Sequence, residues 1–254
     1  MVRDEPGIVG FPDLENTRFA SLALGDTNRT VFQTYCGYYA PIAHFNAKKD
    51  FDSLQQAQLF DTLRKQDVVL VSLHSTRSKA VDNYGLTDQE LSFIRRLSAA
   101  TRVVVTMFGN PYSLRYFDFA PTLLEAFTED PLAQESAAQA LFGANDIVGK
   151  LPVTASPTAR YAQGIYKKFP QKRMGYSLPE AVGMSSDTLG LMNELVQQMI
   201  ESGAAPGCQI LVAKDNRIVW HRAYGAQTYE QTSPVTLENL YDLASVTKVA
   251  ATVI

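Results

Sequence analysis

The sequence is poor in the residues that mark several classes of protein. Its 254 residues contain two cysteines, Cys36 and Cys208, which are too few and too far apart to indicate a disulfide framework. The three histidines, His44, His74 and His221, lack the spacing of metal ligands. No lysine- and arginine-rich run occurs, and the formal net charge is −3, so nothing favours nucleic acid as a partner. We therefore predict no metal, no cofactor and no nucleic-acid partner.

Long apolar runs are also missing. The longest apolar stretches are of strand length, which predicts no transmembrane segment. The first six residues are followed by no apolar run, so we expect no targeting signal in this chain. In contrast, 46% of the residues are hydrophobic and 19% are charged, which are ordinary values for a chain that buries a core. The length fits one large domain or two ordinary ones.

Strand-like and helix-like patterns alternate through the first 155 residues. Apolar runs of strand length lie at 18–24, 42–45, 67–73, 102–108 and 122–127. Helical spacing or capping patterns follow at 30–36, 53–65, from 87 onward and at 131–142. Alternation with short connections predicts an α/β fold, a parallel sheet with helices on both faces.

Polar residues follow several of the predicted strands. Ligands of open α/β sheets bind beyond the carboxyl ends of the strands, which makes these residues candidates. They are Gly25, Asp26, Ser72, His74, Ser75, Thr76, Arg77, Gly109 and Asn110. No Gly-x-Gly-x-x-Gly or phosphate-loop pattern follows the first strand, so a nucleotide is not indicated. A small-ligand site and a hydrogen-bonded surface loop at 74–85 both remain open interpretations.

Three motifs in this region carry a family resemblance. They are Phe-Gly-Asn-Pro-Tyr at 108–112, the Glu-Asp-Pro-initiated alanine-rich run at 129–143, and Gly-Lys-Leu-Pro-Val-Thr at 149–154. Residues 15–155 resemble the C-terminal α/β-sandwich domain of glycoside hydrolase family 3, most closely the bacterial β-N-acetylglucosaminidase branch. The resemblance implies that the catalytic residues lie on an N-terminal (β/α)8 barrel, which we expect to be a missing partner of this chain. Glu125 and Glu129 match no motif of the family, and neither is assigned a role.

The second part of the chain follows a segment rich in turn residues. We interpret 156–175, which carries Lys167, Lys168, Lys172 and Arg173, as a linker between a domain at 1–155 and a second one at 176–254. In the second part, helical spacing from Ser186 is followed by a predicted antiparallel hairpin, with arms at 208–214 and 217–225. The predicted architecture is therefore an α/β sandwich followed by a partial α+β segment.

A Ser-x-x-Lys pattern, Ser245 to Lys248, opens a predicted helix near the end of the chain. Residues three apart share one helical face, so the amine could help to take the proton of the hydroxyl in acyl transfer. Together with 206–212 and Tyr224-Gly225, this pattern resembles the start of the serine β-lactamase and penicillin-binding-protein superfamily. The resemblance implies that Ser245 is a nucleophile and Lys248 its base. The alternative interpretation is that Ser245 only caps a helix and that the chain is a non-catalytic interaction or scaffold protein.

Further motifs of that superfamily follow the Ser-x-x-Lys helix, whereas six residues follow Lys248 here. We therefore expect a truncated domain that lacks its C-terminal part, inactive by itself. We also expect residues beyond about 175 to be poorly ordered or held by packing on another domain. The resemblances imply a parent hydrolase of the bacterial periplasm or cell envelope. It would be a β-N-acetylhexosaminidase with an appended serine acyl hydrolase, acting on amino-sugar or peptidoglycan-like material.

Overall fold

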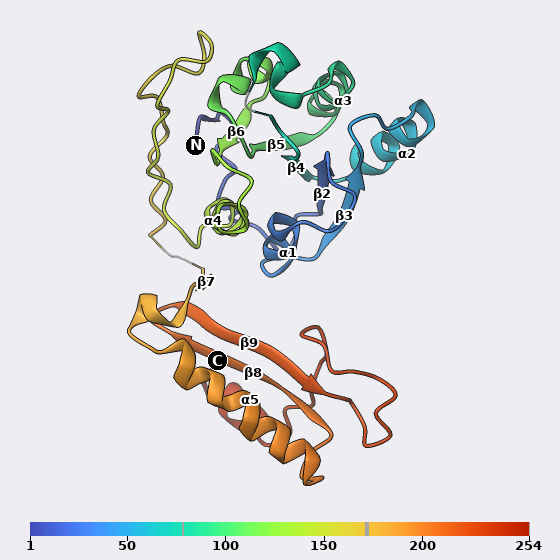
Figure 1. Ribbon diagram of the computed structural model, residues 1–254, viewed down its shortest axis with the longest axis vertical. Helices are drawn as coiled ribbons and strands as arrows, with labels where there is room; N and C mark the ends of the chain where they lie inside the picture. The colour runs from blue at the N-terminus through green and yellow to red at the C-terminus, as the bar shows by residue number, and fades with distance from the viewer. Residues whose placement is uncertain (78, 171–172, 254) are drawn as a thin grey trace. The chain divides into compact units, whose positions relative to one another are not determined.

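The computed structural model describes residues 1–77, 79–170 and 173–253 and divides the chain into two compact units (Figure 1). Unit 1 comprises Met1–Arg173 and unit 2 comprises Met174–Ile254. No helix among the described residues is long and apolar enough to cross a membrane.

Unit 1 is built on a six-stranded sheet. Its strands are β1 (Arg3–Asp4), β2 (Phe19–Leu24), β3 (Ile42–Ala47), β4 (Val68–Leu73), β5 (Arg102–Met107) and β6 (Thr122–Glu125). They are arranged in the order β1-β6-β5-β4-β2-β3, and all neighbours are parallel except β1 and β6. The predicted α/β class and parallel sheet are therefore confirmed. The chain turns back between β2 and β4, with β3 on one side and β4 to β6 on the other, so the switch point of this doubly wound sheet lies there.

Helices cover both faces of this sheet. They are α1 (Val31–Gly37), α2 (Ser53–Leu63), α3 (Asp88–Ser98) and α4 (Pro131–Leu141), with short 3-10 helices η1 (Ala80–Gly85) and η2 (Pro111–Phe117). One buried apolar cluster joins α2, α3 and η2 to one face, and a second joins α1 and α4 to the other (Figure 1). Side chains alternate between the two clusters along each strand, as in β4, where Val69 and Val71 enter the first and Val68 and Leu70 the second. Burial on both faces explains why the strands are continuously apolar.

Local capping signals explain where two of the helices begin. The predicted capping box at α3 is present: the Thr87 hydroxyl accepts the amide of Glu90 at 3.1 Å, and the Glu90 carboxylate accepts the amide of Thr87 at 2.8 Å. At α4, Asp130 accepts the amide of Leu132 at 2.8 Å, and Pro131 occupies the first helical position.

The segment that the sequence suggests as a linker packs for most of its length on unit 1. Ile165 donates its amide to Met1 O at 2.8 Å, and Lys167 Nζ lies 2.7 Å from the buried carboxylate of Asp4. The guanidinium of Arg173 donates to the backbone carbonyls of Gly10, Phe11 and Phe142. We call 147–170 together with Arg173 the strap. Lys167 and Arg173 satisfy buried acceptors instead of facing solvent, whereas Lys168 is exposed. The contacts of these two residues account for the difference from the expected solvated linker. Lys172 lies outside the described residues.

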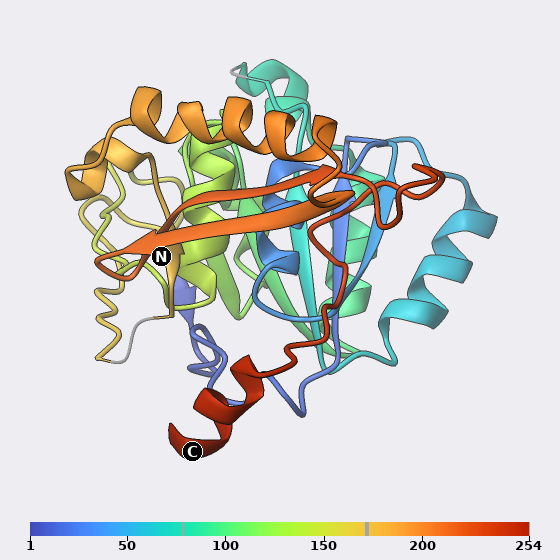
Figure 2. The same ribbon diagram turned by 90° about the horizontal axis from the view of Figure 1, so that it is seen from below.

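Unit 2 is a small α+β arrangement. Strands β8 (Gly207–Lys214) and β9 (Arg217–Gly225) form the predicted antiparallel hairpin, and β7 (Gly175–Tyr176) pairs with β9 in the order β7-β9-β8. The two turn residues, Asp215 and Asn216, both have positive φ, as a tight hairpin of this kind requires. Helix α5 (Ser186–Glu201) lies along the hairpin (Figures 1 and 2), and η3 (Pro179–Val182) precedes it.

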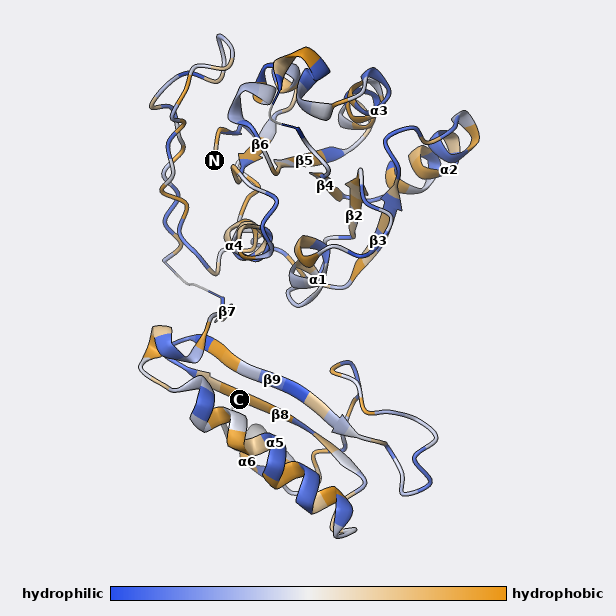
Figure 3. Cartoon of the chain, viewed as in Figure 1, coloured by the Kyte–Doolittle hydropathy of each residue, from blue (hydrophilic) through white to orange (hydrophobic). Residues whose placement is uncertain are grey.

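Helix α5 is amphipathic, and its surface is divided between hydrophobic and hydrophilic residues (Figure 3). Its Leu189 joins Val219 and Trp220 of β9 in the buried cluster of unit 2, and Met192 packs against that cluster. Met192, an unbranched and flexible side chain, thus helps to fill this core. The last helix, α6 (Val246–Val253), begins directly after Ser245.

Candidate functional site

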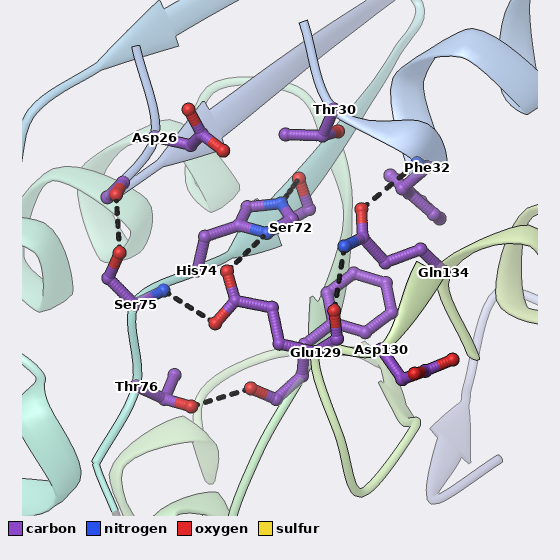
Figure 4. A network of polar contacts seen from close by, with 12 residues as sticks. Asp26, Thr30, Phe32, Ser72, His74, Ser75, Thr76, Glu129, Asp130 and Gln134 are labelled. Atoms are coloured by element: carbon purple, nitrogen blue, oxygen red, sulfur yellow. Dashed lines mark hydrogen bonds and ion pairs between the residues drawn. The ribbon is translucent and has the colours of Figure 1, made fainter. Parts of the chain in front are cut away.

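The carboxyl edge of the unit 1 sheet carries a connected polar network (Figure 4). His74, which directly follows β4, lies with Nε2 2.9 Å from Ser72 Oγ and with Nδ1 3.2 Å from Glu129 Oε1. The other oxygen of Glu129 accepts the amide of Ser75 at 2.8 Å, and the Ser75 hydroxyl donates to Gly25 O at 2.9 Å. Loops that follow β2, β4 and β6 therefore meet at one point of this edge.

The hydrogen bonds among Ser72, His74 and Glu129 follow the pattern of a serine hydrolase triad. The serine of such a triad must be accessible to substrate, however, and Ser72 is not. Ser72 is 0% exposed and His74 is 1% exposed, and the imidazole stacks on the ring of Phe108 at 5.3 Å between centroids. A nucleophile must reach its substrate, so a fully buried hydroxyl cannot serve as one. The network instead holds the loop after β6 against the end of β4.

Glu129 is kept ionised by this network. Burial alone would raise its pKa, but the hydrogen bonds from His74 and the Ser75 amide outweigh burial and lower the pKa. Thr76 joins this network as well, since its amide bonds to Glu129 and its hydroxyl donates to Phe108 O at 2.7 Å. Two other polar candidates at this edge, Arg77 and Asn110, have partners elsewhere. Arg77 pairs with Asp82 at 3.7 Å, and Asn110 caps η2 by accepting the Tyr112 amide at 3.0 Å.

Glu125, at the end of β6, is the least expected carboxyl group of the unit. It is 8% exposed, Oε1 accepts the amide of Phe127 at 2.6 Å, and Oε2 has no partner among the described residues. Burial raises the pKa of Glu125 to about 8. Nothing local in the sequence signals this, since a glutamate at a strand end is ordinarily solvated.

Among the residues that the structure describes, no group of three or more His, Cys, Asp and Glu side chains could hold a metal ion. His44 is engaged elsewhere: its Nδ1 lies 2.7 Å from Ser21 Oγ and its Nε2 lies 3.1 Å from the Arg29 guanidinium. Both cysteines are free thiols, and burial raises the pKa of each.

In unit 2 the structure brings the two predicted site residues together. Ser245 and Lys248 are exposed, and Lys248 Nζ donates to Ser245 Oγ at 3.3 Å. The first amides of α6 bond to backbone carbonyls: Thr247 N to Ala244 O at 3.2 Å and Lys248 N to Ser245 O at 3.1 Å. The hydroxyl of Ser245 thus faces the amine and not an amide of the helix, an arrangement unlike that of a helix cap.

These features define a class of protein: a doubly wound α/β domain joined to an α+β unit that presents a serine–lysine pair at a helix start. Residues 16–186 match the family described as glycosyl hydrolase family 3 C-terminal domain, and residues 192–254 match the family described as beta-lactamase. The chain belongs to the glycosyl hydrolase family 3 C-terminal domain family, and it also carries a beta-lactamase match. Both families are families of hydrolases.

Individual relatives match parts of the chain. An Escherichia coli O157:H7 protein, provisionally named as a D-alanyl-D-alanine carboxypeptidase, is 39% identical over 83 residues, which are 30% of this chain and 19% of that protein. The chain thus spans about a fifth of the length of the curated relatives that it matches.

Two solved structures are similar to part of the chain. One is a fungal multi-domain family 3 β-N-acetylglucosaminidase, with a TM-score of 0.45 and 16% identity, over 56% of this chain and 16% of that one. The other is a family 3 β-N-acetylglucosaminidase from a Paenibacillus species, with a TM-score of 0.43 and 13% identity, over 51% of this chain and 26% of that one.

Proposed function

We propose that this chain works within a larger bacterial cell-envelope hydrolase, in which Ser245 is the nucleophile of an acyl-transfer site and Lys248 is its base. The observation that carries the proposal is the 3.3 Å contact between Lys248 Nζ and Ser245 Oγ, within the residues that match the beta-lactamase family. Both side chains are exposed, so a substrate carbonyl can reach the hydroxyl.

The proposed chemistry is amide or ester hydrolysis in two steps. Ser245 Oγ attacks the carbonyl carbon while its proton passes to Lys248 Nζ, and the bond from carbon to the leaving nitrogen or oxygen breaks as that atom takes up the proton. Water then attacks the acyl-serine, and the hydroxyl of Ser245 is restored.

For unit 1 we propose the role of a companion domain to a β-N-acetylhexosaminidase. The match of residues 16–186 supports this role. The burial of Ser72 and His74 supports it too, because the polar network of this unit then serves structure and not hydrolysis. The proposed partners are an N-terminal (β/α)8 barrel and further strands of the serine hydrolase domain. An amino-sugar or peptidoglycan-like substrate in the periplasm fits both halves, and the carboxypeptidase name of the E. coli relative supports that class of substrate.

A serine-directed fluorophosphonate tests the acyl-transfer site in the full-length protein that contains this chain. The probe forms a bond from Ser245 Oγ to phosphorus and releases fluoride, so the adduct adds a fixed mass to one peptide. We expect labelling of the wild type, none of Ser245→Ala, and slow labelling of Lys248→Ala, because the base contributes about 10²-fold or more. Equal labelling of the wild type and Ser245→Ala would refute the site.

The glycosidase activity is tested separately on the same protein. Hydrolysis of a chromogenic N-acetylglucosaminide should be unchanged in Ser245→Ala, because the proposed barrel carries that chemistry. Loss of this hydrolysis in Ser245→Ala, with the fold intact, would contradict the division of labour. Absence of the activity from the wild type would remove the β-N-acetylhexosaminidase proposal.

A further inference from the structure

The three residues before Ser245, Asp242 to Ala244, form a turn. The Oδ1 atom of Asp242 accepts the amide of Ala244 at 2.8 Å. Ala244 itself has a φ of +44°, in the left-handed region. The next two amides then begin α6: Val246 N bonds to Leu243 O at 2.9 Å, and Thr247 N bonds to Ala244 O. The helix therefore starts immediately after Ser245.

The conformation of Ala244 is one that alanine avoids. A left-handed backbone places Cβ too close to the following carbonyl, which reduces the population of that conformation by roughly tenfold for an L-residue other than glycine. Asp242 offsets this cost, because a carboxylate–amide hydrogen bond of two residues' span is an Asx turn that favours the bend. Without this bond, alanine would favour an extended or right-handed backbone and Ser245 would be displaced.

We propose that Asp242 and the left-handed Ala244 form a positioning turn for the nucleophile. This inference rests on the proposed acyl-transfer function. The turn fixes the backbone of Ser245, and with it two groups that the reaction uses: the hydroxyl that meets Lys248 Nζ at 3.3 Å and the Ser245 amide. That amide has no acceptor among the described residues, so it is available to bond the oxyanion that forms on the substrate. Asp242 acts through Ser245 and does not touch the substrate.

Four variants of the full-length protein test the turn: Asp242→Ala, Asp242→Asn, Ala244→Gly, and the double variant Asp242→Ala/Ala244→Gly. The measurement is the second-order rate constant of fluorophosphonate labelling at Ser245. We expect Asp242→Ala to be about tenfold slower, since it leaves the cost of the left-handed alanine without compensation. Asp242→Asn should stay within about threefold of the wild type, because an amide oxygen accepts the same hydrogen bond. The double variant should recover most of the loss, because glycine adopts positive φ without the steric cost.

Several outcomes would overturn the positioning role. They are a wild-type rate in Asp242→Ala, equal slowing by alanine and asparagine, and no recovery in the double variant. The pH dependence of labelling should be the same in Asp242→Ala as in the wild type, since Lys248 is unchanged; a shifted profile would mean that Asp242 takes part in proton transfer. All four variants should remain folded at the temperature of the labelling assay, which their thermal unfolding curves check. If the wild type itself is not labelled, the proposed acyl-transfer function is refuted. If the wild type is labelled and Asp242→Ala is labelled at the same rate, only the positioning role of the turn is refuted.

Discussion

Replacement of Glu125 by glutamine should stabilise unit 1 at neutral pH. The side chain lies at the end of β6, is 8% exposed and has one oxygen without a partner among the described residues. Glutamine has the same shape and can accept the same amide hydrogen bond from Phe127, so the substitution removes the ionisable group with little change in packing. Because an ionised carboxylate is costly at such a position, the variant should keep the fold and gain stability.

The size of the effect follows from the pKa. Burial raises the pKa of Glu125 to about 8, from an ordinary value of 4.5. Below pH 4.5 the carboxyl group is protonated in both the folded and the unfolded state, so the wild type loses nothing there. As pH rises from 4.5 towards 8 the unfolded state ionises first, and the folded state is progressively destabilised. At 1.36 kcal/mol for each pH unit, the loss is about 3 kcal/mol at pH 7 and reaches about 5 kcal/mol above pH 8.

Urea denaturation between pH 4.5 and 9 measures this difference. The gap in unfolding free energy between Glu125→Gln and the wild type should be near zero at pH 4.5 and widen steadily up to pH 8. Glu129→Gln, on the loop that follows β6, is the matched control of opposite sign. The carboxylate of Glu129 has a lowered pKa, so this glutamine variant should be less stable than the wild type at neutral pH. Its deficit should shrink as pH falls through the pKa of the folded state. A gap for Glu125→Gln that does not change with pH would refute the burial argument.

Three further predictions concern unit 1. Lys167→Ala should lower the unfolding free energy by about 3 kcal/mol, because it leaves the buried carboxylate of Asp4 without its cation. In urea denaturation, the double variant Lys167→Ala/Asp4→Asn should lose less unfolding free energy than the two single variants added together. Additive losses would show that the two ions do not interact. The pKa of His44 is lowered to about 4 by burial and by the charge of Arg29, so the folded state should lose stability as pH falls from 6.5 to 4, where the unfolded state takes up the proton first. The thermal midpoint of His44→Gln should not show this loss over the same pH range. An NMR titration that places the pKa of His44 near 6.5 would contradict the prediction. Phe127 has a φ of +62° and is 44% exposed, so Phe127→Gly should stabilise the unit by about 1 kcal/mol. Phe127→Ala is the control, because alanine keeps Cβ. Equal thermal midpoints for the two variants would exclude backbone strain as the cause.

Local patterns in the sequence predict most of the elements and few of the contacts between them. The parallel strands are long apolar runs, the capping box at Thr87 is complete within four residues, and Ser245 meets Lys248 because one helical turn brings them together. In contrast, β1 has only two residues, and it is defined by its antiparallel pairing with β6, in which Arg3 lies opposite Leu123. The bond between His74 and Glu129 joins residues 55 apart, and the strap meets the N-terminal segment from the other end of unit 1. Such contacts depend on the complete topology, which no short window of sequence contains.

Two serines of this chain show how exposure separates a structural hydroxyl from a candidate nucleophile. Ser72 lies 2.9 Å from an imidazole that is itself linked to a carboxylate, a better-connected arrangement than that of Ser245, which meets a single amine at 3.3 Å. Yet Ser72 is 0% exposed, on a strand with helices over both faces of its sheet, whereas Ser245 is exposed at the start of a helix. Attack on a carbonyl requires an approach path to the hydroxyl and a donor for the oxyanion. The exposed hydroxyl of Ser245 meets the first requirement, and our proposal assigns the second to the Ser245 amide. Conversion of Ser72 to alanine should therefore leave labelling by the phosphonate unchanged and reduce only stability, by about 1–3 kcal/mol for the partner that His74 loses.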